Sequence, residues 1–313
     1  MDKLDKIYLC GHNGMVGSAV GRALRQRGYS KIITRSSKEL DLRNQAATLA
    51  FFEQEHPDCA VVAAARVGGI AANMNDLSGF LYDNAMIAFN VINSAYLSGV
   101  KKLLFLGSSC IYPRMAKQPI NESALLTGSL EPTNEGYALA KIAGLKYCEY
   151  LNCERGVKFI SAMPCNLYGP GDNYHPEHSH VLPALIRRCH EAKLAGTANV
   201  TIWGTGSPLR EFLFVDDLAD ACVFLLENYN GSQFINIGSG EEISISELAS
   251  LVAKIVGYRG DILFDPGRPD GTPRKLLDVT AIHSLGWTHA TPLEAGIRLT
   301  YDNFLSNPIR TER

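Results

Sequence analysis

The sequence predicts an α/β fold, with a doubly wound parallel sheet and a smaller, discontinuous α/β lobe. Short apolar runs such as 59–65 alternate in the first half of the chain with helical stretches such as 137–155. This alternation is typical of right-handed βαβ units and a parallel sheet. After Pro164 the composition changes to one rich in glycine, proline and histidine. We expect the lobe to begin there.

The whole-chain composition is that of a soluble globular protein. The 313 residues suffice for two domains, or one domain with a lobe, and 46% of them are hydrophobic. A net charge of -2 argues against nucleic acid or a membrane surface as partner. The N-terminus carries no secretory segment, and no apolar run approaches about 20 residues. Eight scattered cysteines without zinc-like spacing predict reduced thiols, no metal and a cytoplasmic location.

The first strand, 7–10, ends in a glycine turn. Gly11, Gly14 and Gly17 follow this strand and precede a helical stretch from Ser18 to Arg27. In a dinucleotide-binding turn the first glycine makes the tight turn, and the second lets a pyrophosphate approach the backbone. The third lets the helix pack closely on the strand. The strand before and the helix after favour a Rossmann-type dinucleotide site over a plain βα turn.

The second strand, 32–34, is followed by Arg35, two serines and Lys38. An NAD-selective site carries an acid at this point, which holds the ribose 2′-hydroxyl. Basic and hydroxyl-bearing side chains instead suit a 2′-phosphate. We therefore predict NADP(H) as the cofactor, with a solvated loop carrying two cations as the alternative.

Three further apolar runs predict strands at 59–65, 102–108 and 158–164, with a helical stretch at 83–98 between the first two. Ligands of doubly wound sheets bind outside the carboxyl ends of the strands. We therefore expect the segments that follow the strands to share one crevice. These segments are 11–17, 64–69, 108–110 and 164–167.

The chain is expected to alternate between the two parts. Residues 1–165 and 212–240 are assigned to the nucleotide-binding domain, because a strand–helix pattern returns at 212–227 and a further strand follows at 234–237. Residues 166–211 and 241–313 are assigned to the lobe. The second of these segments contains a helix that begins at Ser244, with Glu247 three residues later as in a capping box.

A tyrosine and a lysine lie four residues apart in the helical stretch 137–155. Tyr137 and Lys141 would share one face of the helix. An ammonium beside a phenol lowers the phenol's pKa, so this tyrosine could transfer protons near neutral pH. Taken alone the pair is weak, because the same spacing is common on solvated helix faces.

Seven segments together resemble the GDP-L-fucose synthase family of extended short-chain dehydrogenases/reductases, and they span nearly the whole chain. In order they are GHNGMVGSAV, AAARVGGI, LLFLGSSCIYP, EPTNEGYALAKIAG, MPCNLYGPGDNYHPEHSHVLPALIRR, VTIWGTGSPLREFLFVDDLA and PDGTPRKLLDVT. The resemblance implies a nucleotide-sugar substrate, GDP-4-keto-6-deoxy-D-mannose. It also implies 3,5-epimerisation and NADPH-dependent reduction at C4 to GDP-L-fucose. A homodimer joined through the helices at 83–98 and 137–155 is implied as well.

The resemblance places five catalytic residues. Ser108, Tyr137 and Lys141 would serve the reduction, whereas Cys110 as base and His180 as acid would serve the epimerisation. Side chains two apart on extended backbone face the same side, so Ser108 and Cys110 could reach one sugar ring. Without the resemblance, Cys110 reads as a buried thiol. Spacing alone does not select His180 among the neighbouring histidines.

The resemblance also implies binding residues. Cofactor contacts are expected at Gly11, His12, Asn13, Gly14, Met15, Val16, Gly17, Arg35, Lys38, Asp41, Leu42, Leu106, Gly107, Ser108, Tyr137, Lys141, Pro164, Asn166, Leu167 and His180. GDP contacts are expected at Arg188, Trp203, Arg210, Asp270 and Lys275, since arginine forks suit phosphate. The alternative is surface arginines and a lobe-packing tryptophan. Asn13, Arg66 and Cys165 stand where the family usually has Arg, Lys and Thr.

Other functions remain open at this stage. A nucleotide-sugar 4,6-dehydratase would carry an Asp-Glu pair where this chain has Ser109 and Cys110. A 4-epimerase would retain its NAD without net turnover. A C4 reductase acting on another GDP- or nucleotide-linked keto sugar is hard to separate by sequence. A non-enzymatic scaffold is disfavoured because Tyr137 and Lys141 are both present.

Overall fold

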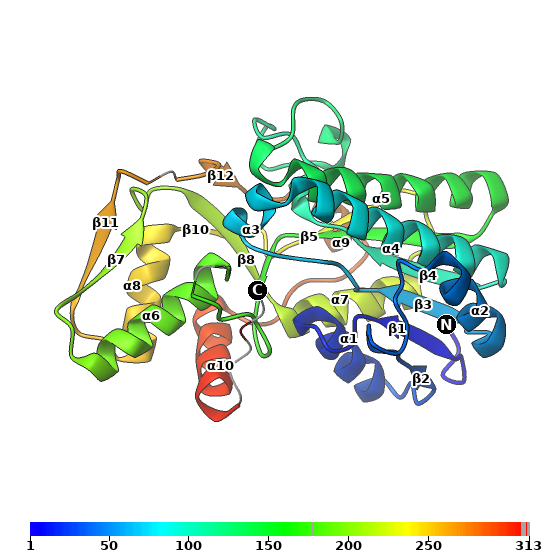
Figure 1. The fold of residues 1–313 in the computed structure, drawn as a ribbon, viewed down its shortest axis with the longest axis horizontal. Helices are drawn as coiled ribbons and strands as arrows, with labels where there is room; N and C mark the ends of the chain where they lie inside the picture. The colour runs from blue at the N-terminus through cyan, green and yellow to red at the C-terminus, as the bar shows by residue number, and fades with distance from the viewer. Residues whose placement is uncertain (177, 269, 308–310, 312–313) are drawn as a thin grey trace.

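The computed structural model describes residues 1–176, 178–268, 270–307 and 311; the last part of the segment assigned to the lobe, 308–310 and 312–313, lies outside them. Among the described residues, a six-stranded parallel sheet has the order β2-β1-β3-β4-β5-β9 (Figure 1). Its side chains are largely buried, which explains the continuous apolar runs. The predicted doubly wound parallel sheet is confirmed. Its strands are β1 Ile7–Cys10, β2 Ile32–Ile33, β3 Cys59–Val62, β4 Lys102–Leu106, β5 Lys158–Pro164 and β9 Ile235–Ile237.

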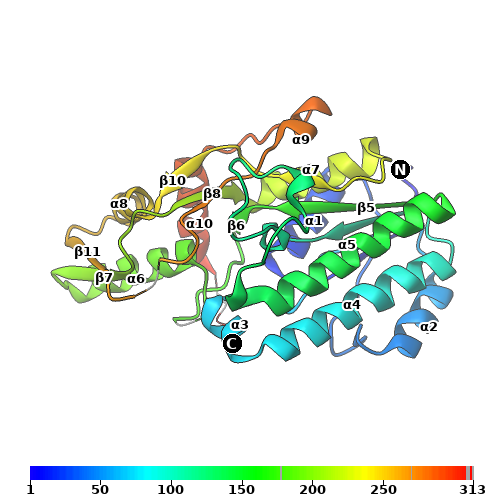
Figure 2. The ribbon, with the colours of Figure 1, turned by 90° about the horizontal axis from the view of Figure 1, so that it is seen from above.

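Helices cover both faces of this sheet (Figure 2). On one face lie α2 Gln45–Glu55, α4 Leu77–Leu97 and α5 Glu135–Arg155. On the other lie α1 Met15–Gln26, α7 Val215–Asn228 and α9 Thr280–Ser284. Two separate apolar cores fill the spaces between the sheet and these layers. The carboxyl ends of the strands are left open to one side, where ligands of such sheets bind.

A second, smaller body lies beyond those carboxyl ends. Its strands are β6 Asn166–Tyr168, β8 Leu209–Phe214, β10 Glu242–Ser244 and β12 Arg274–Lys275, which pair around β8, and the separate pair β7 Asn199–Trp203 and β11 Asp261–Asp265. Helices α6 Val181–Ala195, α8 Ile245–Val256 and α10 Leu293–Ser306 enclose a third apolar core. We call this body the lobe.

The strand near Phe212 differs from the sequence-based expectation. We expected a strand–helix unit returning to the parallel sheet, but β8 pairs only with β6, β10 and β12 in the described part of the chain. Its helix α7 does return, and it packs on α1. Hydrophobic periodicity identifies a buried strand but carries no information on its pairing partner.

Several boundaries also shift. The strands expected to run to residues 65 and 108 end at Val62 and Leu106, because the chain leaves the hydrogen-bond ladder there. Helices α1 and α4 begin earlier than expected, at Met15 and Leu77. The capping box at the start of α8 is confirmed, with both reciprocal hydrogen bonds present. Within the described residues, no helix is both long and apolar enough to cross a bilayer.

The remaining short elements connect these layers. They are α3 Ile70–Asn75 and the 3-10 turns η1 Ser109–Ile111, η2 Glu122–Ala124 and η3 Pro132–Asn134. Two of the turns, η1 and η3, contribute side chains to the site described next.

Candidate active site between the parallel sheet and the lobe

The glycine turn after β1 packs tightly against the protein's own backbone. Gly11 has a φ of +77°, and a Cβ there would lie 2.8 Å from the backbone of Ala63 on the neighbouring strand's loop. A Cβ on Gly17 would overlap the carbonyl oxygen of Gly11. His12 Nδ1 is buried and has no hydrogen-bond partner among the described residues. A tight glycine turn with an unsatisfied polar atom at the start of α1 fits a dinucleotide pyrophosphate.

The loop after β2 forms hydrogen bonds to a carboxylate of its own, that of Glu39. Both the N–H and the hydroxyl of Ser36 donate to the carboxylate of Glu39, at 2.7 Å each. These bonds lower the pKa of Glu39. Arg35 pairs with Glu55 at 2.7 Å, and Lys38 is exposed. The donors and cations expected for a 2′-phosphate are therefore present, with Arg35 partly engaged elsewhere.

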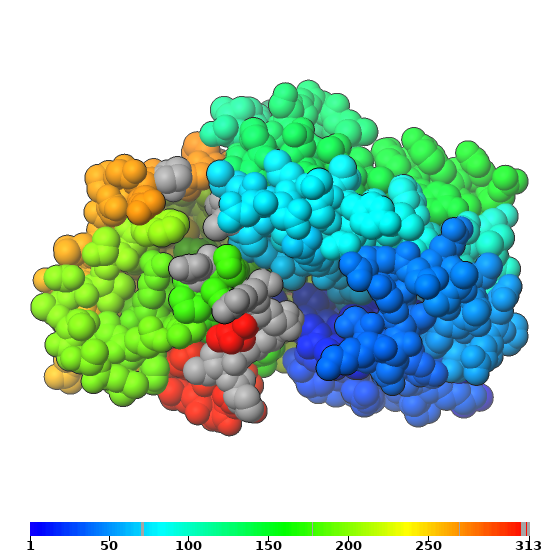
Figure 3. Space-filling model, in the orientation of Figure 1, coloured from blue at the N-terminus to red at the C-terminus, as the bar shows by residue number. Residues whose placement is uncertain are grey.

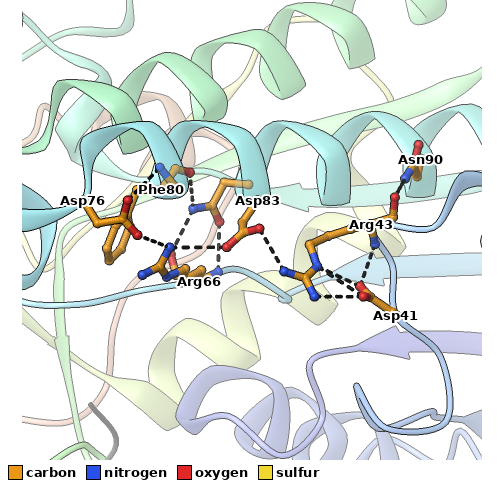
Figure 4. Close-up of polar contacts among 9 residues, drawn as sticks. Asp41, Arg43, Arg66, Asp76, Phe80, Asp83 and Asn90 are labelled. Carbon is orange, nitrogen blue, oxygen red and sulfur yellow. Dashed lines mark hydrogen bonds and ion pairs between the residues drawn. The ribbon is translucent and has the colours of Figure 1, made fainter.

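A chain of ion pairs runs from this side of the sheet along α4 (Figure 4). Arg43 binds Asp41 at 2.8 Å and Asp83 at 3.0 Å. Arg66 then binds Asp83 at 3.3 Å and Asp76 at 2.7 Å, and its guanidinium lies over the ring of Phe80. Arg66, one of the family departures noted above, thus anchors the loop after β3 to α4.

Backbone contacts complete this anchoring. The Asn84 side chain exchanges two hydrogen bonds with the backbone of Arg66, and Asn90 donates to the carbonyl oxygens of Leu42 and Arg43. Asp41 and Leu42, both expected cofactor contacts, are therefore held from two sides. The structure places them beside α4.

The proposed reductase residues converge at the end of β4. Lys141 is buried, and its Nζ donates to the carbonyl oxygen of Leu106 at 2.7 Å. The same Nζ lies 5.7 Å from the centroid of the Tyr137 ring. Ser108 contacts the Tyr137 hydroxyl. One helix face and one strand end thus bring Ser108, Tyr137 and Lys141 together; the spacing predicted the shared face of Tyr137 and Lys141, and the resemblance implied Ser108.

The protonation of this group differs from expectation. Burial, with Cys110 adding to it, raises the pKa of Tyr137 above its usual range, and only the Ser108 hydroxyl opposes the rise. Burial lowers the pKa of Lys141 to about 7. We expected Lys141 to lower the pKa of Tyr137. Desolvation instead raises the pKa of Tyr137 and lowers the pKa of Lys141. Without a ligand the phenol is protonated at neutral pH.

Cys110 lies beside this group but not for the reason expected. The extended backbone ends at Ser108, whose hydroxyl caps the 3-10 turn η1 by accepting the N–H of Cys110 at 3.2 Å. Ser109 is buried, whereas Ser108 and Cys110 are both partly exposed. The inference that Ser108 and Cys110 share one side therefore survives, although a helical turn rather than a strand produces it.

The Cys110 sulfur is contacted by two donors from distant segments. Asn134 Nδ2, in η3, lies 3.2 Å from it, and Lys275 Nζ, in β12, lies 3.6 Å from it. We expected Lys275 to contact GDP, and no role was assigned to Asn134. Asn134 lies three residues before Tyr137 in the block EPTNEGYALAK, which is the signal by which it could have been found.

His180 reaches the same region from the lobe. It is the N-cap residue of α6, with no side-chain capping bond. The residue as a whole is exposed to solvent, but desolvation of its ring and, next, the Lys275 ammonium lower the pKa of His180.

The segment that carries His180 docks on the loop after β3. The N–H of Gly69 donates to the carbonyl oxygen of His178 at 3.2 Å. A Cβ on Gly69 would lie 3.1 Å from that oxygen and 3.3 Å from the carbonyl oxygen of Ser179. Figure 3 shows the cyan surface of α3 and early α4 lying beside the green surface of the lobe. The fold thus brings the lobe histidine toward the ends of the parallel strands.

Cations expected at the GDP end are adjacent in one sheet. Lys275 on β12 is the register partner of Arg210 on β8, in a parallel pair. Burial lowers the pKa of the Arg210 guanidinium, with Asp270 opposing this. Arg188 lies partly buried on α6. Two of the three expected cations are therefore neighbours.

Trp203 exposes its ring to solvent, whereas Asp270 is hydrogen-bonded to a neighbouring loop. The Trp203 ring is 58% exposed, and Arg268, which sequence reasoning missed, covers it with its guanidinium 4.9 Å from a ring centroid. Asp270 accepts the N–H and hydroxyl of Thr205 at 2.7 and 2.8 Å, so it closes the loop between β7 and β8. Trp203 thus offers a flat surface, and the exposed Asp270 also holds the neighbouring loop in place.

Further residues expected to contact the cofactor line the ends of β4 and β5. Gly107 has no space for a side chain, because a Cβ would overlap the Met163 thioether. Asn166 donates to the carbonyl oxygen of Glu211 at 2.7 Å, Pro164 is buried, and Leu167 is partly buried. In the turn after β1, Met15 and Val16 open helix α1, and Asn13 is exposed. No group of three or more metal-ligating side chains is found among the described residues.

Known proteins resemble this chain over nearly its whole length. The model of the NAD dependent epimerase/dehydratase family matches residues 7–238. GDP-L-fucose synthase 1 of Arabidopsis thaliana is 58% identical over 98% of this chain and 95% of its own length. GDP-L-fucose synthase of Escherichia coli (strain K12) is 52% identical over 97% and 98%. A solved GDP-mannoheptose C4 reductase from Campylobacter jejuni with NADP bound has a TM-score of 0.90 and 38% identity, covering 98% of this chain and 100% of its own.

Proposed function

This chain belongs to the NAD-dependent epimerase/dehydratase family, and from that premise we propose that it converts GDP-4-keto-6-deoxy-D-mannose to GDP-L-fucose. The enzyme is an NADPH-dependent epimerase and reductase. It inverts C3 and C5 of the sugar and then reduces C4. Identities of 58% and 52% to GDP-L-fucose synthases along nearly the whole chain support this function.

The surroundings of Cys110 are the observation at the site that carries this proposal. A partly exposed thiol, Cys110, contacts an ammonium and an amide beside the Ser108, Tyr137 and Lys141 group. Reduction of a ketone requires a proton donor but no thiol. A thiol held by donors at the same site supports a second reaction, in which a base removes protons next to the ketone.

The cofactor is NADP(H), which supplies hydride to C4 of the sugar. The glycine turn around Gly11 and Gly17, with the orphaned Nδ1 of His12, would hold the pyrophosphate at the start of α1. The loop around Ser36, with Arg35 and Lys38, would bind the 2′-phosphate. Lys141 would hold the nicotinamide ribose by its ammonium.

The epimerisation requires a base and an acid on opposite faces of the ring. The 4-ketone acidifies the C–H bonds at C3 and C5. Cys110 would remove each proton as a thiolate, and the electron pair of the broken bond would pass to the ketone oxygen as an enolate. His180 would return a proton to the other face from its imidazolium, which restores the ketone with inverted carbon.

The reduction follows at C4. Tyr137, which burial keeps protonated, would donate its phenolic proton to the C4 oxygen as hydride arrives. Ser108 would donate a hydrogen bond to the same oxygen. Arg188, Arg210 and the exposed face of Trp203 would bind the diphosphate and guanine, while Lys275 lies between that end and Cys110.

The test is a product assay on the purified protein with the keto sugar, comparing NADPH with NADH. We expect NADPH oxidation matched by GDP-L-fucose, identified by NMR, and slower turnover with NADH. The Cys110→Ser variant should bind NADPH normally but lose fucose formation by at least about 100-fold, because an alcohol is a far weaker base near pH 7. Unchanged fucose yield from that variant would remove Cys110 from the mechanism.

A second candidate is a C4 reductase of another GDP-linked keto sugar, which the 38% identity to the GDP-mannoheptose C4 reductase favours. Deuterium incorporation separates the two candidates. In heavy water the epimerase places deuterium at C3 and C5 of the product, whereas a simple reductase places none there. Efficient NADPH oxidation without this label would select the reductase.

We also propose a homodimer formed through α4 and α5. These two helices pack on each other and present large apolar side chains to solvent, which supports an interface. The exposed residues are Leu81, Tyr82 and Phe89 on α4, and Leu139 and Tyr150 on α5. Phe89 also meets Tyr147 edge to face across the two helices.

The Phe89→Glu variant should therefore be monomeric at micromolar concentration, because a charge in the centre of this face would have to be desolvated on association. Light scattering gives the mass in solution. Leu194→Glu, at an exposed position on α6 of the lobe, is the matched control and should leave the dimer intact. A dimeric Phe89→Glu protein, or a monomeric parent, would exclude this interface.

We propose a cytoplasmic location. Its support is that all eight cysteines are unpaired, and seven of them are buried or partly buried. Reduced thiols are typical of that compartment.

A further inference from the structure

The position of Lys275 is not explained by nucleotide binding alone. It stands on the two-residue strand β12, next to Arg210 in the sheet of the lobe. From there its Nζ reaches Cys110, 165 residues earlier in the chain, at 3.6 Å from the sulfur. Binding of the diphosphate alone does not explain this contact between Lys275 and the Cys110 thiol.

Lys275 is the cation that contacts the Cys110 sulfur among the described residues. Asn134 is neutral, and Tyr137 is a partly buried phenol whose raised pKa keeps it protonated. The buried carboxylate of Glu211, on β8, accepts the backbone N–H groups of Gly240 and Leu277 and is thereby turned toward the main chain. No other ammonium or guanidinium donates to Cys110 in the described part of the chain.

The same ammonium also acts on the second epimerisation group. Lys275 lowers the pKa of His180, after the larger effect of burial. A positive charge stabilises a neighbouring thiolate and destabilises a neighbouring imidazolium. It therefore makes the thiolate available as a base, and it makes a protonated histidine a stronger acid.

From this geometry we infer that Lys275 is a positioning residue for the epimerisation, whose ammonium holds Cys110 in the thiolate form that attacks the C3 and C5 protons. This inference rests on the proposed function for the identity of those protons. In each epimerisation the C–H proton passes to the Cys110 sulfur and the bonding electrons pass to the ketone oxygen. The proton that replaces it comes from the His180 imidazolium. Exchange with water then restores the thiolate and the imidazolium.

The test measures the thiolate directly, without any sugar or cofactor. The rate of Cys110 alkylation by iodoacetamide is followed by mass spectrometry of its peptide at several pH values. In Lys275→Met we expect the rate at pH 7 to fall about tenfold, because the variant lacks the charge that stabilises a thiolate, and the difference from the parent to shrink at alkaline pH. Lys275→Arg should recover most of the rate, because it keeps the charge.

Two controls separate this role from others. Cys153 is exposed on α5 and reports reagent quality in the same sample, so its rate should not change. Arg210→Met removes the neighbouring cation and should weaken binding of GDP, while Cys110 alkylation stays at the parental rate.

An unchanged alkylation rate of Cys110 in Lys275→Met, together with weakened GDP binding, would overturn the inference and leave Lys275 as a diphosphate ligand. If Lys275→Met does not fold, as judged by circular dichroism and by alkylation of the buried Cys148, Lys275→Gln replaces it. Failure of the proposed function gives a different pattern, because the alkylation test can succeed in a protein that makes no GDP-L-fucose.

Discussion

Replacement of Tyr137 by Phe is expected to lower NADPH oxidation by at least about 100-fold while leaving epimerisation active. The ring remains in place and only the hydroxyl is lost. In the proposed mechanism that hydroxyl is the proton donor for the C4 oxygen, and its raised pKa keeps it protonated across the neutral range. Cys110 and His180 do not depend on it for their protons. Deuterium should therefore still enter C3 and C5 of the unreduced keto sugar in heavy water.

The measurement compares NADPH oxidation with deuterium incorporation, followed by NMR, in the same sample. Tyr258→Phe is the matched control, since Tyr258 also donates a hydrogen bond through its hydroxyl but lies in the core of the lobe. It should retain parental turnover. Parallel loss of both activities in Tyr137→Phe would mean that the tyrosine is needed for the epimerisation too, and would contradict the separation of roles.

Replacement of Lys141 by Met is expected to abolish reduction and, at the same time, to stabilise the protein. Burial lowers the pKa of Lys141 to about 7 from its ordinary value of 10.5. Between these pH values the unfolded chain binds more protons than the folded chain, so the parent gains stability as pH rises from 7 to 10.5. At pH 7 and below, the parent carries a buried charge that the variant lacks.

The variant should accordingly be more stable by about 1–3 kcal/mol at pH 6 to 7, with the difference shrinking toward pH 10. Loss of the bond to the Leu106 carbonyl oxygen acts in the opposite direction. Urea unfolding at pH 6, 7 and 9 gives the difference. Lys146→Met, on the same helix but in a surface ion pair with Glu149, should change stability little at any of these pH values. Lower stability of Lys141→Met at pH 6 would show that the Leu106 bond outweighs the buried charge.

The elements that sequence could predict are those with a local cause. The parallel strands are continuous apolar runs, and the glycine turn has a steric reason at Gly11 and Gly17 that is visible in the spacing. Tyr137 and Lys141 share a helix face by periodicity alone. These features therefore followed from the residues themselves.

Other features depend on contacts between distant segments. Strand β12 has two residues, too few to show any periodicity, yet it delivers Lys275 to Cys110. The pairing of β8 within the lobe is likewise invisible in its own apolar pattern. At Cys110 a 3-10 turn replaced the expected strand, because the Ser108 hydroxyl caps it. The lowered pKa of Lys141 required knowledge of burial that spacing does not give.

The docking of the His180 segment has a consequence for which substitutions the protein can tolerate. The contact joins the N–H of Gly69 to the carbonyl oxygen of His178, so it uses main-chain atoms alone. Changes of side chain at position 178 would leave both atoms in place. Any side chain at position 69 would push against the carbonyl oxygens of residues 178 and 179. Substitutions are therefore tolerated more readily at position 178 on the lobe side of this junction than at position 69 on the sheet side, although Gly69 has no proposed role in the chemistry.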